Sequence, residues 1–484
     1  MPKTPLPLPA RLNPVGATFI ASLLLSLIAW LGSTINRDGM LYVRVGQAFI
    51  DGGFAAAREA FHWPFLGIFM GLLAKISGLS IEHAGYLINA LFMAGASALM
   101  VACVQRRQPA LVWLTALSVL ALPGLNEYRN ELLREFGAWY FGMLSLWLAL
   151  RWDEKPTWLP VLVIQVCLGL AMLFRPEMAC LYGALILWQL FAAPRGERLR
   201  RSAMLGALPL LGVALLTAAY LGGQIPADSR LAFDLGRINS ASFDAKAELL
   251  ASGLIDYARD DTRAILFFGS LALIPLKLIN KFGIFLLPLG FLFLARARDQ
   301  GLGRHALFTW AIAMQVLVLA IFVLDLQFLS GRYVGPILLF SVPFVAAGLH
   351  AMLARLPRWR LPILAVPLLI ALANVVSLSP SKAYLVDAGH WLTANIQEPT
   401  TVYIDSGRTA YHAGWLNLQT PTRNDRPAIA AAVADPRYRL FVLEISRHDP
   451  APDEWLDSLG LHVVQRFEHA KGDAVIVAER RAKP

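Results

Sequence analysis

The chain has 484 residues, of which 57% are hydrophobic and 16% are charged, and its formal net charge at pH 7 is +10. A soluble protein is typically about 45–50% apolar and about 25% charged. The composition therefore excludes an ordinary soluble enzyme and indicates a protein that crosses a membrane many times. The sequence has no basic tail and no basic run mixed with aromatic residues, so we predict no nucleic-acid partner. We expect the positive charge to reflect the membrane topology instead.

Apolar runs of spanning length recur along most of the chain. The first covers 19–31 and lacks a small-residue cleavage site, which favours a retained helix over a signal peptide. Further spans are expected near 81–104, 109–125, 132–150, 157–175, 177–193, 204–222, 264–295, 305–325, 334–353 and 361–378. The sequence thus predicts a polytopic α-helical membrane protein with about eleven transmembrane helices.

Arginine and lysine gather in alternate loops, on the same side as Lys3 and Arg11. By the positive-inside rule this side is cytoplasmic. The loop after the first helix and the C-terminus then lie outside, which in a bacterium means the periplasmic face of the inner membrane.

Two domains are expected, a transmembrane domain over 1–378 and a periplasmic α/β domain over 379–484. Within the first domain, 37–78 and 223–263 are predicted as outer segments with interfacial or amphipathic helices. In the second, strand-like runs alternate with helical ones, which is typical of a small α/β domain. The expected strands are 401–405, 438–444, 461–467 and 473–478, and the expected helices are 384–396 and 425–434.

Asp38 lies in the stretch 35–42 that follows the first apolar run, where a carboxylate must face water, a cavity or a partner. The next stretch, 42–50, alternates apolar and polar residues at helical spacing, as an interfacial helix does. Asp38 is thus expected at a membrane surface, between a spanning helix and an interfacial one. The alternative is a solvated residue at a helix end.

Further charged groups stand at the outer ends of apolar runs. Arg134 and Glu135 are expected one to two turns inside an apolar helix, where a charge is usually paired or faces a wet cavity. The others are Arg175, Glu177, Lys277, Lys281 and Arg332, the last followed by Tyr333. Each alone has a structural explanation, because long side chains reach the interface and acid–base pairs bridge helix ends. Together they suggest an outward cavity of mixed charge.

Such a cavity suits group transfer from a lipid-linked donor, because nucleotide-activated sugars are not present outside the cytoplasmic membrane. A phosphate leaving group departs as an anion and needs positive charge more than a proton. The acceptor hydroxyl needs one base, so a single carboxylate suffices, whereas most glycosidases need two. Direct displacement with one base inverts the anomeric centre.

The chain resembles the GT-C class of integral-membrane glycosyltransferases, in particular the bacterial branch related to protein O-mannosyltransferases and the aminoarabinose transferase of lipid A. The resemblance covers essentially the whole chain. It rests on five short features: Asp38 with Tyr42 after the first helix, the run 64–67 with 79–84, the run 175–177, Arg332-Tyr333 with Pro336, and the terminal α/β domain.

The resemblance implies that Asp38 is the catalytic base and that Arg332, Lys277 and Lys281 bind the donor phosphate. Two departures are visible. Relatives often carry a second acid beside the catalytic Asp, where this chain has Gly39, and a Glu-Lys pair before the proline that here follows His62-Trp63. No cofactor is predicted, metal dependence stays open, and His62 is a candidate for an acceptor or phosphate contact.

We therefore expect a glycosyltransferase that moves a sugar from a polyprenyl-phosphate donor to a glycan, lipid or protein acceptor of the cell envelope. The residues expected to line the cavity or bind acceptor are Tyr42, His62, Arg134, Glu135, Arg175, Glu177 and Tyr333. The alternative is a transporter or flippase for an anionic lipid or lipid-linked glycan, since a basic intramembrane cavity suits that as well. A third possibility is a non-catalytic component of an envelope glycan assembly.

Overall fold

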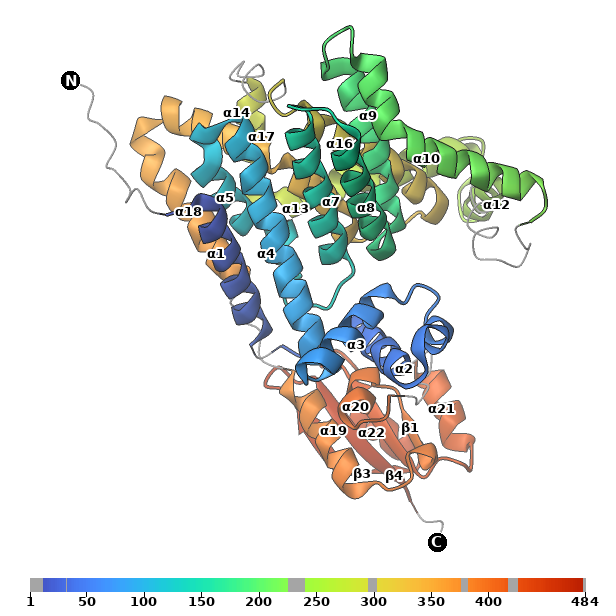
Figure 1. Cartoon of the computed structure of the whole chain (residues 1–484). Coiled ribbons are helices and arrows are strands. Elements are labelled where there is room, and N and C mark those ends of the chain that lie inside the picture. The colour runs from blue at the N-terminus through green and yellow to red at the C-terminus, as the bar shows by residue number, and fades with distance from the viewer. Residues whose placement is uncertain are drawn as a thin grey trace. The chain divides into compact units, whose positions relative to one another are not determined.

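The structure is a computed structural model, in which helices form most of the chain and one small sheet lies near the C-terminus (Figure 1). The residues that it describes are 12–31, 33–224, 240–294, 303–375, 382–416 and 425–481. They form two compact units. The first comprises the segments Met1–Ser26, Ala90–Arg129 and Arg134–Val375, and the second comprises Leu27–Asn89, Asn130–Leu133 and Val376–Pro484.

Five helical segments are long and apolar enough to cross a membrane. They are α4 (Ile81–Arg107), α10 (Arg198–Leu221), the segment Thr262–Phe293, α16 (Ala306–Leu326) and Gly331–Arg355, which includes α17 (Gly335–Arg355). The segment Thr262–Phe293 consists of α13 (Thr262–Phe282), a 3-10 turn and the start of α14 (Leu286–Leu294). The protein is a multi-pass membrane protein, as its composition predicts.

Every predicted span overlaps a helix of the structure. The remaining ones are α1 (Pro14–Trp30), α5 (Val112–Ala121) with the short α6 (Pro123–Asn126), α7 (Glu135–Trp152), α8 (Trp158–Phe174), α9 (Cys180–Ala192) and α18 (Arg360–Ala373). Several of these are shorter than the roughly 20 residues that a crossing needs. The number eleven therefore stays a prediction.

Helix α17 is the centre of the first unit. All residues from 335 to 349 are buried, and α14, α16 and α5 pack against it. A helix that is apolar on all sides is stable only when other helices surround it. Its position bears on the predicted site because the candidate residues Arg332 and Tyr333 lie in the 3-10 turn Gly331–Val334 directly before it.

Arg129 is a buried cation, only 4% exposed, and holds α1 to the segment after α6. Its guanidinium donates to the Ser22 carbonyl at 2.8 Å, to Ser26 Oγ at 2.6 Å, to Ser22 Oγ at 3.1 Å and to Asn126 Oδ1 at 2.8 Å. Each of its three nitrogens has a partner, which a buried charge requires. Arg129 therefore has a structural explanation in hydrogen bonding alone.

The second unit begins with the end of α1, followed by α2 (Arg37–Ala60) and α3 (Phe65–Ser77), which pack against each other. Both helices lie where the sequence predicts interfacial helices. The buried residues of α2 recur at helical spacing, with Gly39, Tyr42, Val43 and Gly46 among them, which gives the helix one apolar face. Gly53, with φ of 72°, interrupts its last part.

The C-terminal part of this unit is a four-stranded sheet in the order β1-β2-β4-β3. Its strands are β1 (Val402–Ile404), β2 (Leu440–Ile445), β3 (Leu461–Glu468) and β4 (Ala474–Arg480). β1 and β2 are parallel, and the other pairs are antiparallel. The helices are α19 (Ala383–Asn395), α20 (Gly407–His412), α21 (Arg426–Ala434) and α22 (Pro452–Ser458). All four predicted strands and both predicted helices of this domain are confirmed.

Alternate strand residues build two apolar cores on the two faces of the sheet. Val402, Ile404 and Val442 face α19 and α20, whereas Phe441 and Leu443 face α21 and α22. This period of two follows from strand geometry. The helices α20 and α22 are short, of 6 and 7 residues, and were not predicted because their sequences carry too few turns to show a helical period.

Two expectations about the helices are wrong. Glu135 is the first residue of α7 and Arg134 precedes it, so neither lies one to two turns inside a helix. In the segment 223–263 the helix α12 (Ser240–Ala251) is present, but its apolar residues are spread around the helix, so it is not amphipathic. Other charges of that predicted segment, Asp228, Arg230, Asp234 and Arg237, lie outside the described residues.

A buried carboxyl group lies at the end of β1, beside the parallel pair of strands β1 and β2. Asp405 follows β1, is only 5% exposed and accepts a hydrogen bond from the Glu444 backbone N–H at 2.8 Å. Burial, reinforced by the Glu444 carboxylate, raises the pKa of Asp405 from 3.8 to about 7. Next to it, the Ser406 hydroxyl donates to Glu444 Oε2 at 2.9 Å, and Ser406 caps α20.

This pKa predicts how local stability depends on pH. A carboxyl group whose folded pKa is raised stabilises the fold fully below pH 4, and this contribution is lost as the pH rises to about 7. The change is equivalent to at most about 4 kcal/mol. Hydrogen exchange of the amides of β1 and β2 in the full-length protein, corrected for intrinsic rates, should show less protection at pH 8 than at pH 5.

Asp405→Asn should reduce this pH dependence, because asparagine keeps the acceptor oxygen and does not ionise. Asp457→Asn, at a carboxylate whose side chain is 60% exposed, is the matched control and should leave it unchanged. An undiminished pH dependence in Asp405→Asn would show that another group causes it.

Candidate functional site

Asp38 lies in the first turn of α2, where a carboxylate is favoured by the helix dipole. The start of α2 is held by Asn36, whose side chain forms two hydrogen bonds with the backbone of Leu132. Asn36 Oδ1 accepts from the Leu132 N–H at 3.0 Å, and Asn36 Nδ2 donates to the Leu132 carbonyl at 3.3 Å. This reciprocal pair fixes the backbone two residues before Asp38.

Asp38 lines a cavity of about 320 Å³, hereafter the Asp38 cavity. Its walls come from α2 and from α20 with the residues that follow it, two elements that pack against each other in the second unit (Figure 1). The lining residues are Arg37, Asp38, Met40, Leu41, Arg44, Gly407, Ala410, Tyr411, Trp415 and Leu416. Asp38 is the one carboxylate among them, and two arginines accompany it.

The hydroxyl of Tyr411 donates to Glu82 Oε2 at 2.7 Å. Because Glu82 lies in the first turn of α4, this hydrogen bond ties the α20 wall of the cavity to the rest of the second unit. Burial raises the pKa of Tyr411 above its usual range, as does the neighbouring Glu82 carboxylate. Tyr411 therefore remains a hydrogen-bond donor at any physiological pH.

Tyr42 and His62, both expected at the site, are not among the residues that line the Asp38 cavity. The Tyr42 ring is 4% exposed and packs edge-on against Phe61 at 6.4 Å between centroids. The His62 ring contacts the same phenylalanine at 4.7 Å. The structure thus gives Tyr42 and His62 a common packing role beside Phe61.

In the first unit, Glu135 joins two arginines that are distant in the sequence. It is 4% exposed, and its Oε1 lies 3.3 Å from Arg175 Nη1 and 3.4 Å from Arg332 Nε. Arg175 also pairs with Glu177, and its guanidinium lies 4.7 Å from the centre of the Tyr333 ring. These five residues, hereafter the Glu135 cluster, were all predicted as site residues, and the structure brings them together.

Two glycines allow the helices to meet at this cluster. A Cβ at Gly137 of α7 would lie 2.5 Å from the Phe174 ring, and one at Gly335 of α17 would overlap the Trp139 ring. The helices α8 and α17 therefore approach α7 more closely than larger residues would permit, as small residues do in membrane bundles. Arg175 directly follows α8 and Arg332 precedes α17, so this close packing places both arginines near Glu135.

Lys281 forms a neighbouring ion pair with Glu127 at 2.5 Å and lies 5.3 Å from the centre of the Tyr128 ring. A Cβ at Gly331 would lie 2.7 Å from the Tyr128 hydroxyl and 2.9 Å from Lys281 Nζ. Lys281 is thus close to the turn that carries Arg332. Lys277 lies one helical turn earlier in α13, and no ion pair joins it to a described residue.

The described residues contain no group of three or more His, Cys, Asp or Glu side chains that could hold a metal ion. At the Asp38 cavity, the lining residues explain why a metal ion would bind poorly. One carboxylate beside two guanidinium groups is a poor ligand set for a hard divalent cation, which prefers several oxygen ligands. The lining of the Asp38 cavity therefore does not suit a divalent metal ion.

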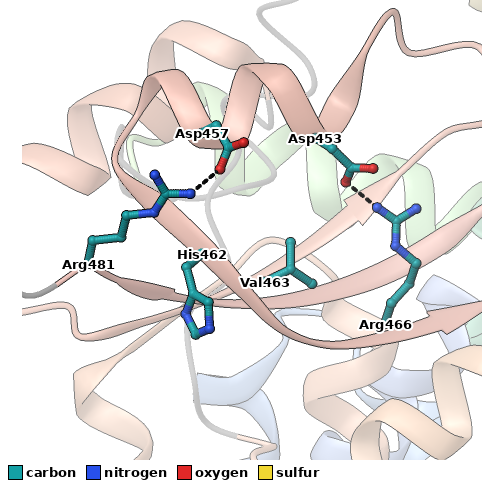
Figure 2. A pocket seen from close by; sticks show the side chains of 6 residues that line it. All are labelled: Asp453, Asp457, His462, Val463, Arg466 and Arg481. Atoms are coloured by element: carbon teal, nitrogen blue, oxygen red, sulfur yellow. Dashed lines mark hydrogen bonds and ion pairs between the residues drawn. The ribbon is translucent and has the colours of Figure 1, made fainter.

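A second hollow, of about 400 Å³, lies on the C-terminal domain (Figure 2). Its two arginines are already paired, Arg466 with Asp453 and Arg481 with Asp457, the latter at 2.5 Å. Both acids are more than half exposed, so these are surface salt bridges of small energetic value. Both arginines of this hollow are therefore already bound to acids, whereas the arginines of the Asp38 cavity form no ion pair with a described residue.

Comparison with known proteins finds similarity in structure alone. No protein-family model and no curated protein sequence matches the chain. The structure is similar to ArnT from Cupriavidus metallidurans bound to undecaprenyl phosphate, with a TM-score of 0.57 and 13% identity over 96% of this chain and 97% of ArnT.

The structure is also similar to the oligosaccharyltransferase of Archaeoglobus fulgidus. The TM-score is 0.51 with 15% identity for its complex with zinc and sulfate, over 85% of this chain. For the form tethered to an acceptor peptide the TM-score is 0.51 with 12% identity, over 89% of this chain and 69% of that protein. In the first comparison the chain spans 58% of the length of the oligosaccharyltransferase.

Both proteins are GT-C glycosyltransferases, so the chain has the GT-C fold, as its sequence resemblance implies. At these identities the likeness concerns the fold and assigns no substrate. Arg44, Tyr411 and Trp415 are cavity residues that the sequence did not reveal. Arg44 lies in the same helix as Asp38, whereas Tyr411 and Trp415 were missed because the packing of α2 against α20 joins positions more than 360 residues apart.

The Glu135 cluster predicts a large stability difference between two Glu→Gln variants. Removing one partner of a buried ion pair costs about 3–5 kcal/mol, whereas an exposed pair contributes about 0–1 kcal/mol. Glu135→Gln should lower the free energy of unfolding, measured by titration with SDS in mixed micelles, by at least about 2 kcal/mol. Glu154→Gln, which breaks the exposed pair with Arg106, is the control. Equal effects would contradict the structural role of Glu135.

Proposed function

We propose that this protein is a glycosyltransferase that transfers a sugar from a polyprenyl-phosphate donor to an acceptor of the cell envelope. The observation that carries the proposal is Asp38, the one carboxylate of a cavity with two arginines, in a chain with the GT-C fold. The active side and the C-terminal domain are proposed to face the periplasm of a bacterial inner membrane. The acceptor is a glycan, a lipid or a protein.

The donor class is supported by the cationic side chains of the first unit. Arg332, Lys277 and Lys281 are proposed to bind the donor phosphate. Arg332 keeps 26% of its side chain exposed while one nitrogen faces Glu135, and a guanidinium has five N–H donors, so it can bind a phosphate at the same time. ArnT, which shares the fold, has been seen with undecaprenyl phosphate.

The reaction proposed is a direct displacement at the anomeric carbon. The acceptor oxygen forms the new bond to this carbon, the bond from carbon to the phosphate oxygen breaks, and the polyprenyl phosphate leaves as an anion. The carboxylate of Asp38 takes the proton of the acceptor hydroxyl. The positive side chains stabilise the charge that develops on the phosphate, so the leaving group needs no general acid. The product has the inverted configuration.

Asp38→Asn tests the base. Membranes that contain the protein would be given radiolabelled undecaprenyl-phosphate hexoses, and label in a new glycosidic bond would be measured by hydrolysis and chromatography. We expect the variant to lose at least about 100-fold in rate, the effect of a missing general base. Native mass spectrometry should still detect undecaprenyl phosphate on it, and should detect less on Arg332→Ala.

Asp51→Asn is the matched control, because Asp51 is an exposed acid of the same helix that does not line the cavity. Full transfer by Asp38→Asn would remove Asp38 from the role of base. Movement of labelled lipid across vesicle membranes without a new glycosidic bond would instead favour the transporter or flippase function.

A further inference from the structure

The two arginines of the Asp38 cavity differ from those of the Glu135 cluster. Neither Arg37 nor Arg44 forms a hydrogen bond or ion pair through its side chain with a described residue. In addition, Arg44 Nε is buried without a hydrogen-bond partner among the described residues. A buried donor without a partner is costly and calls for an explanation, such as a ligand that supplies the acceptor.

An aromatic wall stands in the same cavity. Tyr411 lies in α20, and Trp415 follows three residues after that helix ends. Trp415 packs partly against the apolar core formed with α19, and its backbone N–H donates to the Ala410 carbonyl at 2.9 Å. Its indole is thus held by the core and borders the cavity. A flat aromatic side chain with a polar edge suits the apolar face of a sugar ring.

The size of the cavity restricts the ligand. About 320 Å³ is at the lower end of the range for small-molecule sites, roughly 300–1,000 Å³. The space suits a single sugar unit with one substituent. The charge of the lining is one carboxylate against two guanidinium groups, so the substituent that it favours is an anion.

We propose that the Asp38 cavity is the acceptor subsite and that the acceptor is a sugar that carries a phosphate group. This inference rests on the proposed function. Arg44 and Arg37 bind the phosphate, for which the planar guanidinium offers paired N–H donors. Trp415 covers the ring, and Asp38 accepts the hydrogen bond of the hydroxyl that receives the new sugar. Tyr411 is a positioning residue that fixes the α20 wall through Glu82.

The experiment measures binding to the purified full-length protein in detergent by isothermal titration calorimetry. The probes are glucose 6-phosphate, inorganic phosphate and glucose. We expect glucose 6-phosphate to bind the wild type at least 10-fold more tightly than glucose. Arg44→Gln should lower the affinity for glucose 6-phosphate and for inorganic phosphate at least 10-fold. Trp415→Ala should lower the affinity for glucose 6-phosphate and leave the affinity for inorganic phosphate unchanged.

Arg58→Gln is the control, because Arg58 lies in the last turn of α2, is exposed and does not line the cavity. It should bind all three probes as the wild type does. Circular dichroism and the unfolding midpoint of each variant verify the fold, and Trp415→Phe replaces Trp415→Ala if the latter does not fold. The proposal is overturned if Arg44→Gln and Arg58→Gln bind glucose 6-phosphate equally, or if glucose binds as tightly as its phosphate.

A competition experiment distinguishes an acceptor phosphate from the donor phosphate. Undecaprenyl phosphate in the same detergent should bind without displacing glucose 6-phosphate, and Arg44→Gln should leave its affinity unchanged. Displacement together with a 10-fold loss in Arg44→Gln would assign the cavity to the donor and overturn the acceptor subsite. The binding assays require no transfer, so an active Asp38→Asn variant would refute the proposed base while the Arg44 result still decides the subsite.

Discussion

The arrangement of helices in the first unit depends on the ion pairs of the buried Glu135 carboxylate. A charge in a membrane helix bundle is costly unless it is paired, so Glu135 and its arginines must be close together in the folded state. Arg175 follows α8 and Arg332 precedes α17. By binding both, Glu135 fixes the ends of two helices against the start of α7, and Gly137 and Gly335 provide the space for that approach.

The Glu135 cluster and the Asp38 cavity differ in how their charged side chains are paired. In the Glu135 cluster the charges balance one another inside the protein, which gives stability and a defined geometry. In the Asp38 cavity, two guanidinium groups accompany a single carboxylate, and neither Arg37 nor Arg44 forms an ion pair with a described residue. The difference is the expected one between a site that is held together by its own charges and one that leaves charges available for a ligand.

The helical part of the fold follows from hydrophobicity, because apolar runs of spanning length enter the membrane, where only a helix satisfies the backbone hydrogen bonds within the segment. Each predicted span has a helix in the structure, and the four strands of the C-terminal domain were predicted from their short apolar runs. The errors lie at helix ends and in short helices. Arg134 and Glu135 lie at the start of α7, because the backbone between α6 and α7 is not helical and this break leaves no signal in hydropathy.

The sequence by itself determined that this is a membrane protein of the GT-C fold, that Asp38 lies between the first helix and the interfacial segment after it, and which charged residues the membrane must accommodate. These properties depend on local composition and on residues near one another in the chain. Tertiary structure alone decided which arginines are paired with an acid and which line a cavity without an ion pair. Glu135 selects Arg175 and Arg332 across the bundle, and α20 brings Tyr411 and Trp415 to Asp38. Such pairings depend on packing between distant segments, which no local pattern records.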